Sequence, residues 1–334
     1  MHITGFRPRS ATPDEVAAYA AVQLAALAAD DPDEPLPARD WLTARLTRPP
    51  SPDVRRLYWV ARDAPDRQLM AVASLMLAGE LDSDLAAINI AVRPGQRRRG
   101  TGTALLRTAA AAGGSRHCLF AEGIRAGTPG AAFADFHQFA VVQQTLLLTL
   151  DLAAVRQASW DLPDPAGYRL VQWTGSAPED LLSSYAAARN AIYEAPQGSM
   201  SFTEPEWSPE RVRAEEAAAR DRACELWVAV AVREQTGAVA GLTYLEVFAQ
   251  EPELGRQQDT AVLAAHRGHG LGAWLKAANL RRLTAARPAV REVRTSNAAD
   301  NEHMLRVNRQ VGFTVTASAQ NREAVLADLR ARVG

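Results

Sequence analysis

The sequence predicts an α/β protein made of two similar domains, each with helices covering a mixed β-sheet (an α+β arrangement). Two observations lead to this prediction. The chain has 334 residues, whereas an ordinary domain has roughly 150. The pattern V-x-x-x-x-R-x-x-G-x-G also occurs twice, at 92–102 and at 262–272, so the second copy lies 170 residues after the first. A pattern that recurs at half the chain length indicates a duplicated fold.

The surroundings of the two patterns predict the same order of elements in both halves. Each pattern follows an apolar, β-favouring run (85–92 and 260–264) and precedes an alanine- and leucine-rich stretch with helical spacing (103–112 and 273–286). Earlier in each half we expect a helix (14–29 and 178–192) and a hairpin (56–77 and 226–247). A strand over 144–150 ends the first half, and 159–167 has the composition of a linker. We therefore expect domains at 1–157 and 158–334.

The composition narrows the class of protein. The 37 basic and 38 acidic residues leave a net charge of -1, which does not favour nucleic acid or an anionic membrane as a partner. Two cysteines, Cys118 and Cys224, exclude a disulfide framework and indicate a reducing compartment. The longest apolar stretch, 139–155, is interrupted by polar residues, so we expect a soluble cytoplasmic protein. Lys276 is the only lysine, and the arginine- and alanine-rich composition is typical of a GC-rich bacterial genome.

The two glycine loops are predicted to bind a phosphate or a diphosphate. A loop that opens a helix presents unpaired backbone N–H groups at the positive end of the helix dipole, and glycine lets an anion approach the backbone closely. The phosphate-binding loop GxxxxGK[ST] does not fit, because no lysine follows either loop. Residues 268–273 satisfy the dinucleotide pattern GxGxxA, but residues 100–105 do not. The two loops share R-x-x-G-x-G, whose arginine either adds charge or braces the loop.

R-x-x-G-x-G after a strand that carries V-x-P resembles the acyl-CoA pyrophosphate motif of the GNAT N-acetyltransferase superfamily. The first half keeps every position of this motif, and the second half has Ala264 in place of the proline. Downstream, 293–297 is similar to the family's next strand, and 301–313 is similar to its N-x-x-A-x-x-x-Y-x-x-x-G-F segment. The chain thus resembles a tandem of two GNAT-like acyl-CoA N-acyltransferase domains, an arrangement like that of mycothiol synthase.

The resemblance implies that an amine attacks the thioester of acetyl-CoA, or of another acyl-CoA, directly and without a metal ion. Backbone amides would hold the pyrophosphate, and a backbone N–H near Val262 would polarise the thioester carbonyl. The partners would be the acyl-CoA and a small-molecule amine, and the protein would be a monomer or a homodimer. The residues expected to bind the cofactor are Val262, Ala264, Arg267, Gly268, His269, Gly270, Leu271, Gly272, Asn297 and Asn301 in the second half, and Val92, Pro94, Arg97, Arg98, Arg99, Gly100, Thr101, Gly102 and Thr103 in the first.

The sequence departs from the family in ways that bear on which half is catalytic. Asn308 stands where many members carry a tyrosine general acid, and an amide cannot donate a proton to a thiolate as a phenol can. In the first half the downstream motif is nearly lost over 127–139, where Phe139 alone remains. We therefore expect catalysis in the second half. Two alternatives stay open: a non-catalytic protein that binds or senses acyl-CoA, and an enzyme whose active site lies in the first half.

Four residues are candidates for proton transfer: Asp259, Glu246, Tyr244 and Asn308. Asp259 is the first choice for the general base, because it lies three residues before Val262 on a predicted strand. Strand alternation would place it on the same face as Gln257 and Ala261. Each candidate has a plainer interpretation as a structural or solvated polar residue.

The remaining polar clusters have weaker interpretations. His266, His269 and His303 suggest a metal site, but no HExxH motif is present and no metal is expected. The resemblance places Asn297, Asn301 and Asn308 on the motif that lines the pantetheine arm in the family, and the alternative is that they serve in helix capping and loop hydrogen bonds. The stretch 193–207 either shapes the acceptor pocket, where its glutamates (Glu194, Glu204 and Glu206) would suit a cationic amine, or is a solvated loop.

Overall fold

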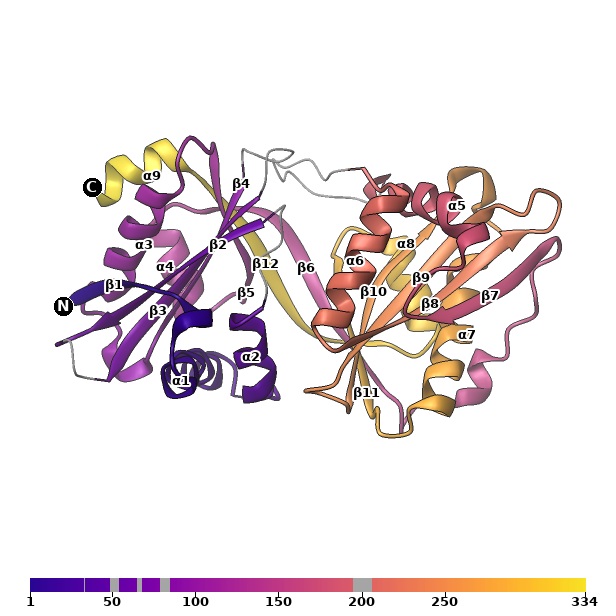
Figure 1. The fold of residues 1–334 in the computed structure, drawn as a ribbon, viewed down its shortest axis with the longest axis horizontal. Helices are drawn as coiled ribbons and strands as arrows, with labels where there is room; N and C mark the ends of the chain where they lie inside the picture. Colours follow the sequence, from indigo (N-terminus) through magenta and orange to yellow (C-terminus); the bar gives the residue numbers. More distant parts are fainter. Residues whose placement is uncertain (33, 49–53, 65–67, 79–84, 195–205) are drawn as a thin grey trace. The chain divides into compact units, whose positions relative to one another are not determined.

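The computed structural model describes residues 1–32, 34–48, 54–64, 68–78, 85–194 and 206–334. The chain forms two compact units. Unit 1 comprises Met1–Gln144 and Ala319–Gly334, and unit 2 comprises Thr145–Gln197 and Glu206–Ser318. Each unit has helices packed on a mixed sheet, so the predicted α/β class is confirmed (Figure 1).

Unit 1 begins with a meander of antiparallel strands. The order of its sheet is β1-β2-β3-β4-β5-β12, in which β4 and β5 are parallel and the other neighbours are antiparallel. Its elements are β1 (His2–Phe6), η1 (Pro8–Ser10), α1 (Pro13–Asp30), α2 (Arg39–Leu46), β2 (Val54–Arg62), β3 (Leu69–Ala78), β4 (Leu85–Val92), η3 (Pro94–Gln96), α3 (Thr101–Ala112), β5 (Cys118–Ile124), α4 (Pro129–Phe136) and β6 (Ala140–Asp151).

Unit 2 repeats this arrangement. Its sheet has the order β6-β11-β10-β9-β8-β7, and β10 and β11 are its parallel pair. The second half of the chain has the elements η4 (Gln157–Trp160), β7 (Tyr168–Thr174), α5 (Glu179–Arg189), η5 (Asn190–Glu194), α6 (Pro209–Asp221), β8 (Cys224–Arg233), β9 (Val239–Phe248), β10 (Leu254–Val262), η6 (Ala264–His266), α7 (Leu271–Ala286), β11 (Glu292–Ala298), α8 (Glu302–Gln310), β12 (Thr314–Val325) and α9 (Leu326–Val333), of which α9 belongs to unit 1. The two predicted strand–loop–helix segments are present as β4–α3 and β10–α7.

Two long strands belong to both units. Residues 140–144 of β6 lie in unit 1, and residues 145–151 pair antiparallel with β11 in unit 2. In the same way β12 begins in unit 2, while its residues from Gln320 onward pair antiparallel with β5 in unit 1, and α9 follows there. The compact units therefore differ from the expected division between residues 157 and 158. Each half of the chain contributes its last strand to the sheet of the other unit.

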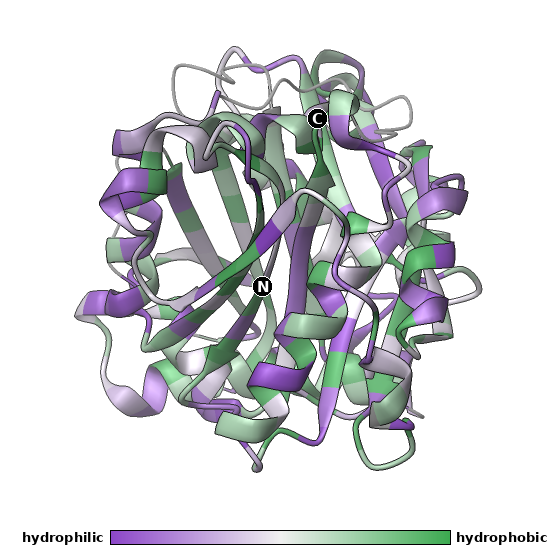
Figure 2. Cartoon of the chain, turned by 90° about the vertical axis from the view of Figure 1, so that its right-hand side faces the viewer, coloured by the Kyte–Doolittle hydropathy of each residue, from purple (hydrophilic) through white to green (hydrophobic). Residues whose placement is uncertain are grey.

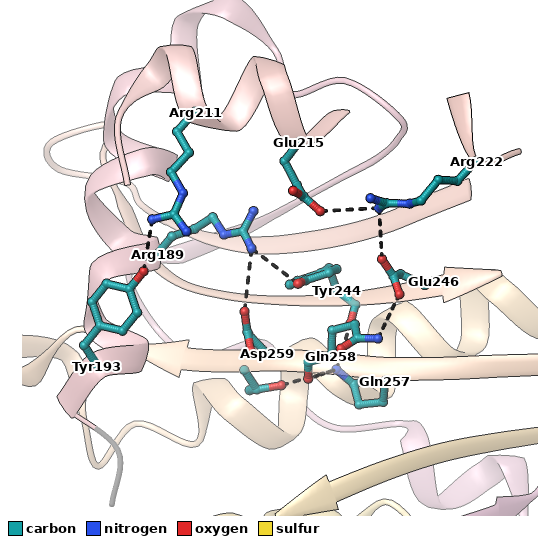
Figure 3. A network of polar contacts seen from close by, with 11 residues as sticks. Arg189, Tyr193, Arg211, Glu215, Arg222, Tyr244, Glu246, Gln257, Gln258 and Asp259 are labelled. Carbon is teal, nitrogen blue, oxygen red and sulfur yellow. Dashed lines mark hydrogen bonds and ion pairs between the residues drawn. The ribbon is translucent and has the colours of Figure 1, made fainter. Parts of the chain in front are cut away.

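Alternation along β9 shows which helices cover each face of the unit 2 sheet. Leu245 and Val247 are buried in one hydrophobic cluster with residues of α7, such as Leu280 and Leu283. Tyr244 and Glu246 point to the other face, on which α5 and α6 lie (Figure 3). Both green and purple residues occur along the helices of unit 2 in Figure 2, as expected for helices with one face on a sheet. No helix in the described ranges has the length and apolar character needed to cross a membrane.

The exchanged C-terminal segment completes the core of unit 1. Leu326 and Leu329 of α9 are fully buried in a cluster with Leu106 of α3 and Leu119 of β5. We expect Leu329→Ala to lower the free energy of unfolding of unit 1 by about 2–5 kcal/mol, because the change removes buried methyl groups and leaves a cavity. Urea denaturation followed by circular dichroism measures this loss. Val325→Ala is the control, since Val325 is 38% exposed, and equal losses in the two variants would contradict the assignment of α9 to the core.

Candidate active site

The two glycine loops have the same backbone conformation. In unit 2, Gly270 is the N-cap of α7 with φ of 75°, and Gly268 has φ of 82°. In unit 1, Gly100 is the N-cap of α3 with φ of 78°, and Arg98 occupies the position of Gly268 with φ of 63°. These values lie in the left-handed region, which glycine enters without the steric cost that a Cβ imposes. The repeated glycines are thus required by the path of the loop.

The N–H groups of both loops are free to bind an anion. Among the described residues, none accepts a hydrogen bond from the backbone N–H groups of 268–272 or of 98–102. These groups point from the first turn of α7 or α3, at the positive end of the helix dipole. No atom lies within 4 Å of a Cβ built on Gly268 or Gly270, so the space over the loop is open. Both loops therefore have the unpaired donors that a bound diphosphate requires.

The arginine that opens each loop braces it. Arg97 donates through Nε to the carbonyl of Val92 and forms a two-point ion pair with Asp30 at the end of α1, at 2.6 and 3.0 Å. Arg267 likewise donates to the carbonyl of Val262, at 3.2 Å, and its side chain is exposed. Pro94 and Ala264, the third positions of the motif, begin the short helices η3 and η6.

The first turns of the two helices have different neighbours. In unit 1, a Cβ on Gly102 would lie 3.1 Å from the ring of Phe133 on α4, and Thr103 Oγ1 lies 3.1 Å from Nε2 of the buried His137. Thr101 is also buried. In unit 2, the nearest atoms to a Cβ on Gly272 belong to Thr260 and Val307 and are 3.9 Å away. An aromatic ring thus covers the start of α3, while the start of α7 has more room.

The parallel strands separate beside each loop. The β10–β11 ladder pairs Leu254–Arg256 with Glu292–Arg294 and does not continue, although both strands do. In unit 1 the β4–β5 ladder likewise ends after Ala87 and Phe120. Backbone groups beyond these points, including those near Val262, are not used by the parallel ladder. Those that do not pair with the antiparallel strand on the other side are open to a ligand that enters between the strands.

A β-bulge distinguishes β10 from its counterpart in unit 1. Gln257 pairs with Leu245 and Thr260 pairs with Thr243, so Gln258 and Asp259 both lie opposite Tyr244. The Gln257 Nε2 and Thr260 Oγ1 atoms both contact Thr243 Oγ1, at 2.9 and 2.7 Å, and so share a face of the sheet. The expectation that alternation puts Asp259 on the face of Gln257 is therefore wrong, because the extra residue reverses the alternation.

Asp259 lies in a cluster of polar side chains on the α5–α6 face (Figure 3). Its carboxylate is 3.6 Å from Nη2 of Arg189, and the same nitrogen donates to the hydroxyl of Tyr244 at 3.3 Å. The Arg189 guanidinium, only 6% exposed, stacks 3.3 Å from the ring centroid of Trp207. Burial raises the pKa of Asp259, and Arg189 opposes that rise. Burial and the Asp259 charge raise the pKa of Tyr244 well above its usual value.

Glu246 lies in an adjoining cluster on the same face. Its carboxylate accepts a hydrogen bond from Gln258 at 2.9 Å and lies 3.7 Å from Arg222, which also pairs with Glu215 at 3.4 Å. Burial raises the pKa of Glu246, and Arg222 lowers it. The Glu246 side chain is 14% exposed, whereas that of Asp259 is 35% exposed. Asp259 is therefore the more accessible of the two carboxylates.

The three asparagines of the downstream motif have structural contacts. Asn301 is the N-cap of α8, where its Oδ1 accepts from the N–H of Met304 at 3.1 Å. Asn308 is fully buried and donates through Nδ2 to Asn297, while its own Oδ1 is buried without a partner among the described residues.

The histidines near the unit 2 loop contact their neighbours. His266 is 2.9 Å from the hydroxyl of Tyr168, and His269 contacts the backbone carbonyls of His266 and Arg267. The described ranges hold no group of three or more His, Cys, Asp or Glu that could bind a metal.

Several residues of these clusters carry no signal in the sequence. Arg189, Arg222 and Gln258 lie outside any motif, and only the pairing of strands and helices shows their neighbours. The stretch 193–207 falls largely outside the described residues, which exclude 195–205 and with them Glu204. At its ends, the hydroxyl of Tyr193 and the carbonyl of Glu206 each lie 3.4 Å from Nη1 of Arg211.

Known proteins share both the sequence pattern and the fold. The model of the acetyltransferase (GNAT) family matches residues 20–135, in unit 1. A mycothiol acetyltransferase from Clavibacter michiganensis subsp. michiganensis is 31% identical over 232 residues, which cover 67% of this chain and 67% of that protein. Another from Mycolicibacterium gilvum is 28% identical over 250 residues, covering 72% of this chain and 75% of that protein.

Solved structures extend the likeness to nearly the whole chain. A tandem GNAT protein from the clavulanic acid biosynthesis pathway is similar with a TM-score of 0.79, at 27% identity, over 97% of this chain and 98% of that one. A GCN5-related N-acetyltransferase from Sphaerobacter thermophilus has a TM-score of 0.68 at 19% identity, over 97% of this chain and 96% of that one, which shows the fold alone. The chain therefore belongs to the GNAT acetyltransferase family as a tandem member, and it is an acetyl-CoA-dependent N-acetyltransferase.

Proposed function

We propose that unit 2 transfers the acetyl group of acetyl-CoA to the amine of a small molecule. The observation that carries this proposal is the position of Asp259, which lies opposite Tyr244 of β9 and on β10, the strand that leads into the open glycine loop. In unit 1 the β3–β4 register is continuous, and the residues 170 positions earlier are Ser74 and Asn89. Unit 1 thus has the loop without the carboxylate.

Different groups of unit 2 would bind the co-substrate, polarise the thioester carbonyl and accept the proton of the amine. The free N–H groups of 268–272 would hold the diphosphate of the co-substrate, and a backbone N–H near Val262 would polarise the thioester carbonyl. Asp259 would accept the proton that the amine loses as it attacks the carbonyl. Its raised pKa brings it closer to neutrality than an ordinary aspartate, which suits a general base. Arg189 and Tyr244 orient its carboxylate.

The acceptor is proposed to be a small polar amine. Two relatives are named mycothiol acetyltransferases, and this name supports a small-molecule acceptor over a protein one. The charged residues on the α5–α6 face, which include Arg189, Asp259 and Glu246, supply polar contacts for such a molecule. A panel of amines tested with acetyl-CoA, read by thiol release, would identify the class. Binding of acetyl-CoA without turnover on any amine would favour a sensing role.

A second location for the chemistry rests on one observation. The family model matches residues 20–135, so unit 1 keeps the family's sequence pattern in its loop and first helices. Unit 1 would then be the catalytic unit, despite the lack of a carboxylate at position 89.

Substitution of the N-cap glycines separates the two locations. We expect Gly270→Val to reduce turnover at least about a hundredfold, because a β-branched residue at φ of 75° distorts the loop and displaces its N–H groups. Gly100→Val makes the same change in unit 1. If Gly100→Val abolishes thiol release and Gly270→Val does not, the active site lies in unit 1. Gly237→Val, in the β8–β9 turn with φ of 72°, is the control for backbone strain alone.

The general base can be identified from the pH dependence of kcat/KM. A base must be ionised, so we expect activity to fall as the pH drops through the raised pKa of Asp259. Asp259→Asn should lower kcat by about 10²–10⁴-fold and remove this acid limb. Glu246→Gln tests the neighbouring carboxylate in the same assay. A larger loss in Glu246→Gln, or an unchanged acid limb in Asp259→Asn, would assign the base to another group.

A further inference from the structure

Lys276 is an unusual residue for its position in the fold. It is the only lysine of the chain, and it lies on α7 with its side chain 2% exposed. The residue 170 positions earlier is Leu106, which is buried in the core of unit 1. The same helix position is thus filled by an apolar residue in unit 1, so the fold does not require an amine there. A buried lysine without a structural need points to a chemical role.

Lys276 lies beside the place where β10 and β11 separate. It follows Gly272 by one helical turn on α7, and that face of α7 contacts Thr260 of β10 and Val307 of α8. Its Nζ is 5.7 Å from the centroid of the Phe313 ring, directly after α8. Asp259 points to the other face of β10, toward α5 and α6. One strand thus lies between the lysine and the carboxylate.

The polar groups around α7 are incompletely paired. Among the residues that the structure describes, none accepts a hydrogen bond from Lys276 Nζ. Four buried amide oxygens of the described residues have no donor, and three of them lie on α7 or on elements packed against it: those of Gln257 on β10, Asn279 on α7 and Asn308 on α8. Asn308 stands where the family carries a tyrosine acid, and its amide cannot supply a proton. A donor is therefore missing at the thioester end of the site, and Lys276 is a donor without an acceptor.

The charges around Lys276 make it a usable acid. Burial lowers its pKa to about 7, and Asp259 opposes this fall. The titratable or charged residues on the elements packed against α7 are Cys224, Glu225 and Arg233 on β8, Tyr244 and Glu246 on β9, Arg256 and Asp259 on β10, and Glu302, His303, Arg306 and Arg309 on α8. Of these, Asp259 is the one that changes the pKa of Lys276. An acid that titrates near neutrality can give up a proton and regain it from water.

We propose that Lys276 donates the proton that the departing CoA thiolate takes up, with Asp259 as its base partner across β10. This inference rests on the proposed function of unit 2. The amine nitrogen bonds to the acetyl carbon and the carbon–sulfur bond breaks, with its electron pair staying on sulfur. The amine proton goes to Asp259, and a proton of the Lys276 ammonium goes to sulfur. Transfer of one proton from Asp259 to Lys276 through solvent then restores both groups.

The coupling between the two groups favours this order of events. An ionised Asp259 stabilises the Lys276 ammonium through their mutual attraction. When Asp259 takes the amine proton, that attraction is lost and Lys276 becomes a stronger acid. This happens at the step in which sulfur acquires negative charge.

The single lysine permits a direct test of the coupling. Protein labelled with ¹³C at the ε carbon of lysine gives one lysine resonance, whose shift against pH reports the pKa of Lys276. We expect a midpoint near 7, far below the usual value of about 10.4, and a lower midpoint in Asp259→Asn. Glu246→Gln is the matched control, and it should leave the midpoint unchanged. A midpoint at the usual value, or one that Asp259→Asn does not move, overturns the proposal.

Measurement of kcat in a Lys276 variant tests whether Lys276 donates the proton. We expect Lys276→Met to lower kcat by about 10²–10⁴-fold, with the KM for acetyl-CoA little changed. The same variant should be at least as stable as the natural protein at pH 7 and below, because burial of the ammonium costs free energy there. Leu106→Met places methionine at the equivalent position of unit 1 and should keep kcat.

The outcomes separate this inference from the proposed function. A Lys276→Met variant that keeps kcat, or loses stability while its folded fraction keeps kcat, shows that the lysine is structural and overturns the inference. If the natural protein turns over no amine, the proposed function fails. The ¹³C titration still decides whether Lys276 and Asp259 are coupled.

Discussion

One extra residue in β10 determines which side chains of unit 2 face each other. The bulge places Gln257 and Asp259 on opposite faces of β10, and Gln257 lies on the face on which Leu245 and Val247 pack against α7. A buried cation, Lys276 of α7, lies on that side of the sheet, and the carboxylate of Asp259 does not. The bulge turns it instead toward Arg189 and Tyr244. The side chains that share a face with Asp259 therefore depend on a local irregularity of the sheet, and bulges are common next to active sites.

A comparison of the two units shows that the backbone of the glycine loop is the same in both, whereas the side chains around it differ. On the proposed function the loops bind through backbone N–H groups, and the backbone conformation of the loop is the same in unit 1, where Arg98 adopts the conformation that glycine has in unit 2. The chemistry depends on side chains, and these differ between the units. Ser74, Asn89 and Leu106 occupy the positions of Tyr244, Asp259 and Lys276. A duplicated fold can thus keep its ligand-binding backbone while one copy loses its reacting groups.

The sequence predicts the loops and not the clusters around them, for a physical reason. A positive-φ turn at a helix start is specified by a few adjacent residues, so Gly268 and Gly270 could be identified from their spacing alone. Asp259 could be identified as a candidate, but its face could not, because a bulge is a property of two paired strands. Arg189 and Trp207 lie on segments far along the chain from Asp259, and no local pattern joins them. The sequence also does not show that β6 and β12 each pair with a strand of the other unit, because an apolar strand does not specify its pairing partner.

The charged side chains near β10 of unit 2 are partly or fully buried, and this burial costs free energy. Arg189, Lys276 and the carboxylates of Asp259 and Glu246 all lose hydration in unit 2. The ion pairs of Asp259 with Arg189 and of Glu246 with Arg222 offset that cost only in part. Unit 1 has the same strand order with neutral residues at the positions of Asp259 and Lys276, so the fold itself is stable without these charges. Groups that weaken a fold and that the fold does not need are expected where they serve binding or catalysis. The charged side chains on both faces of β10 therefore argue for acetyl transfer at this strand, with the proton entering on one face and leaving from the other.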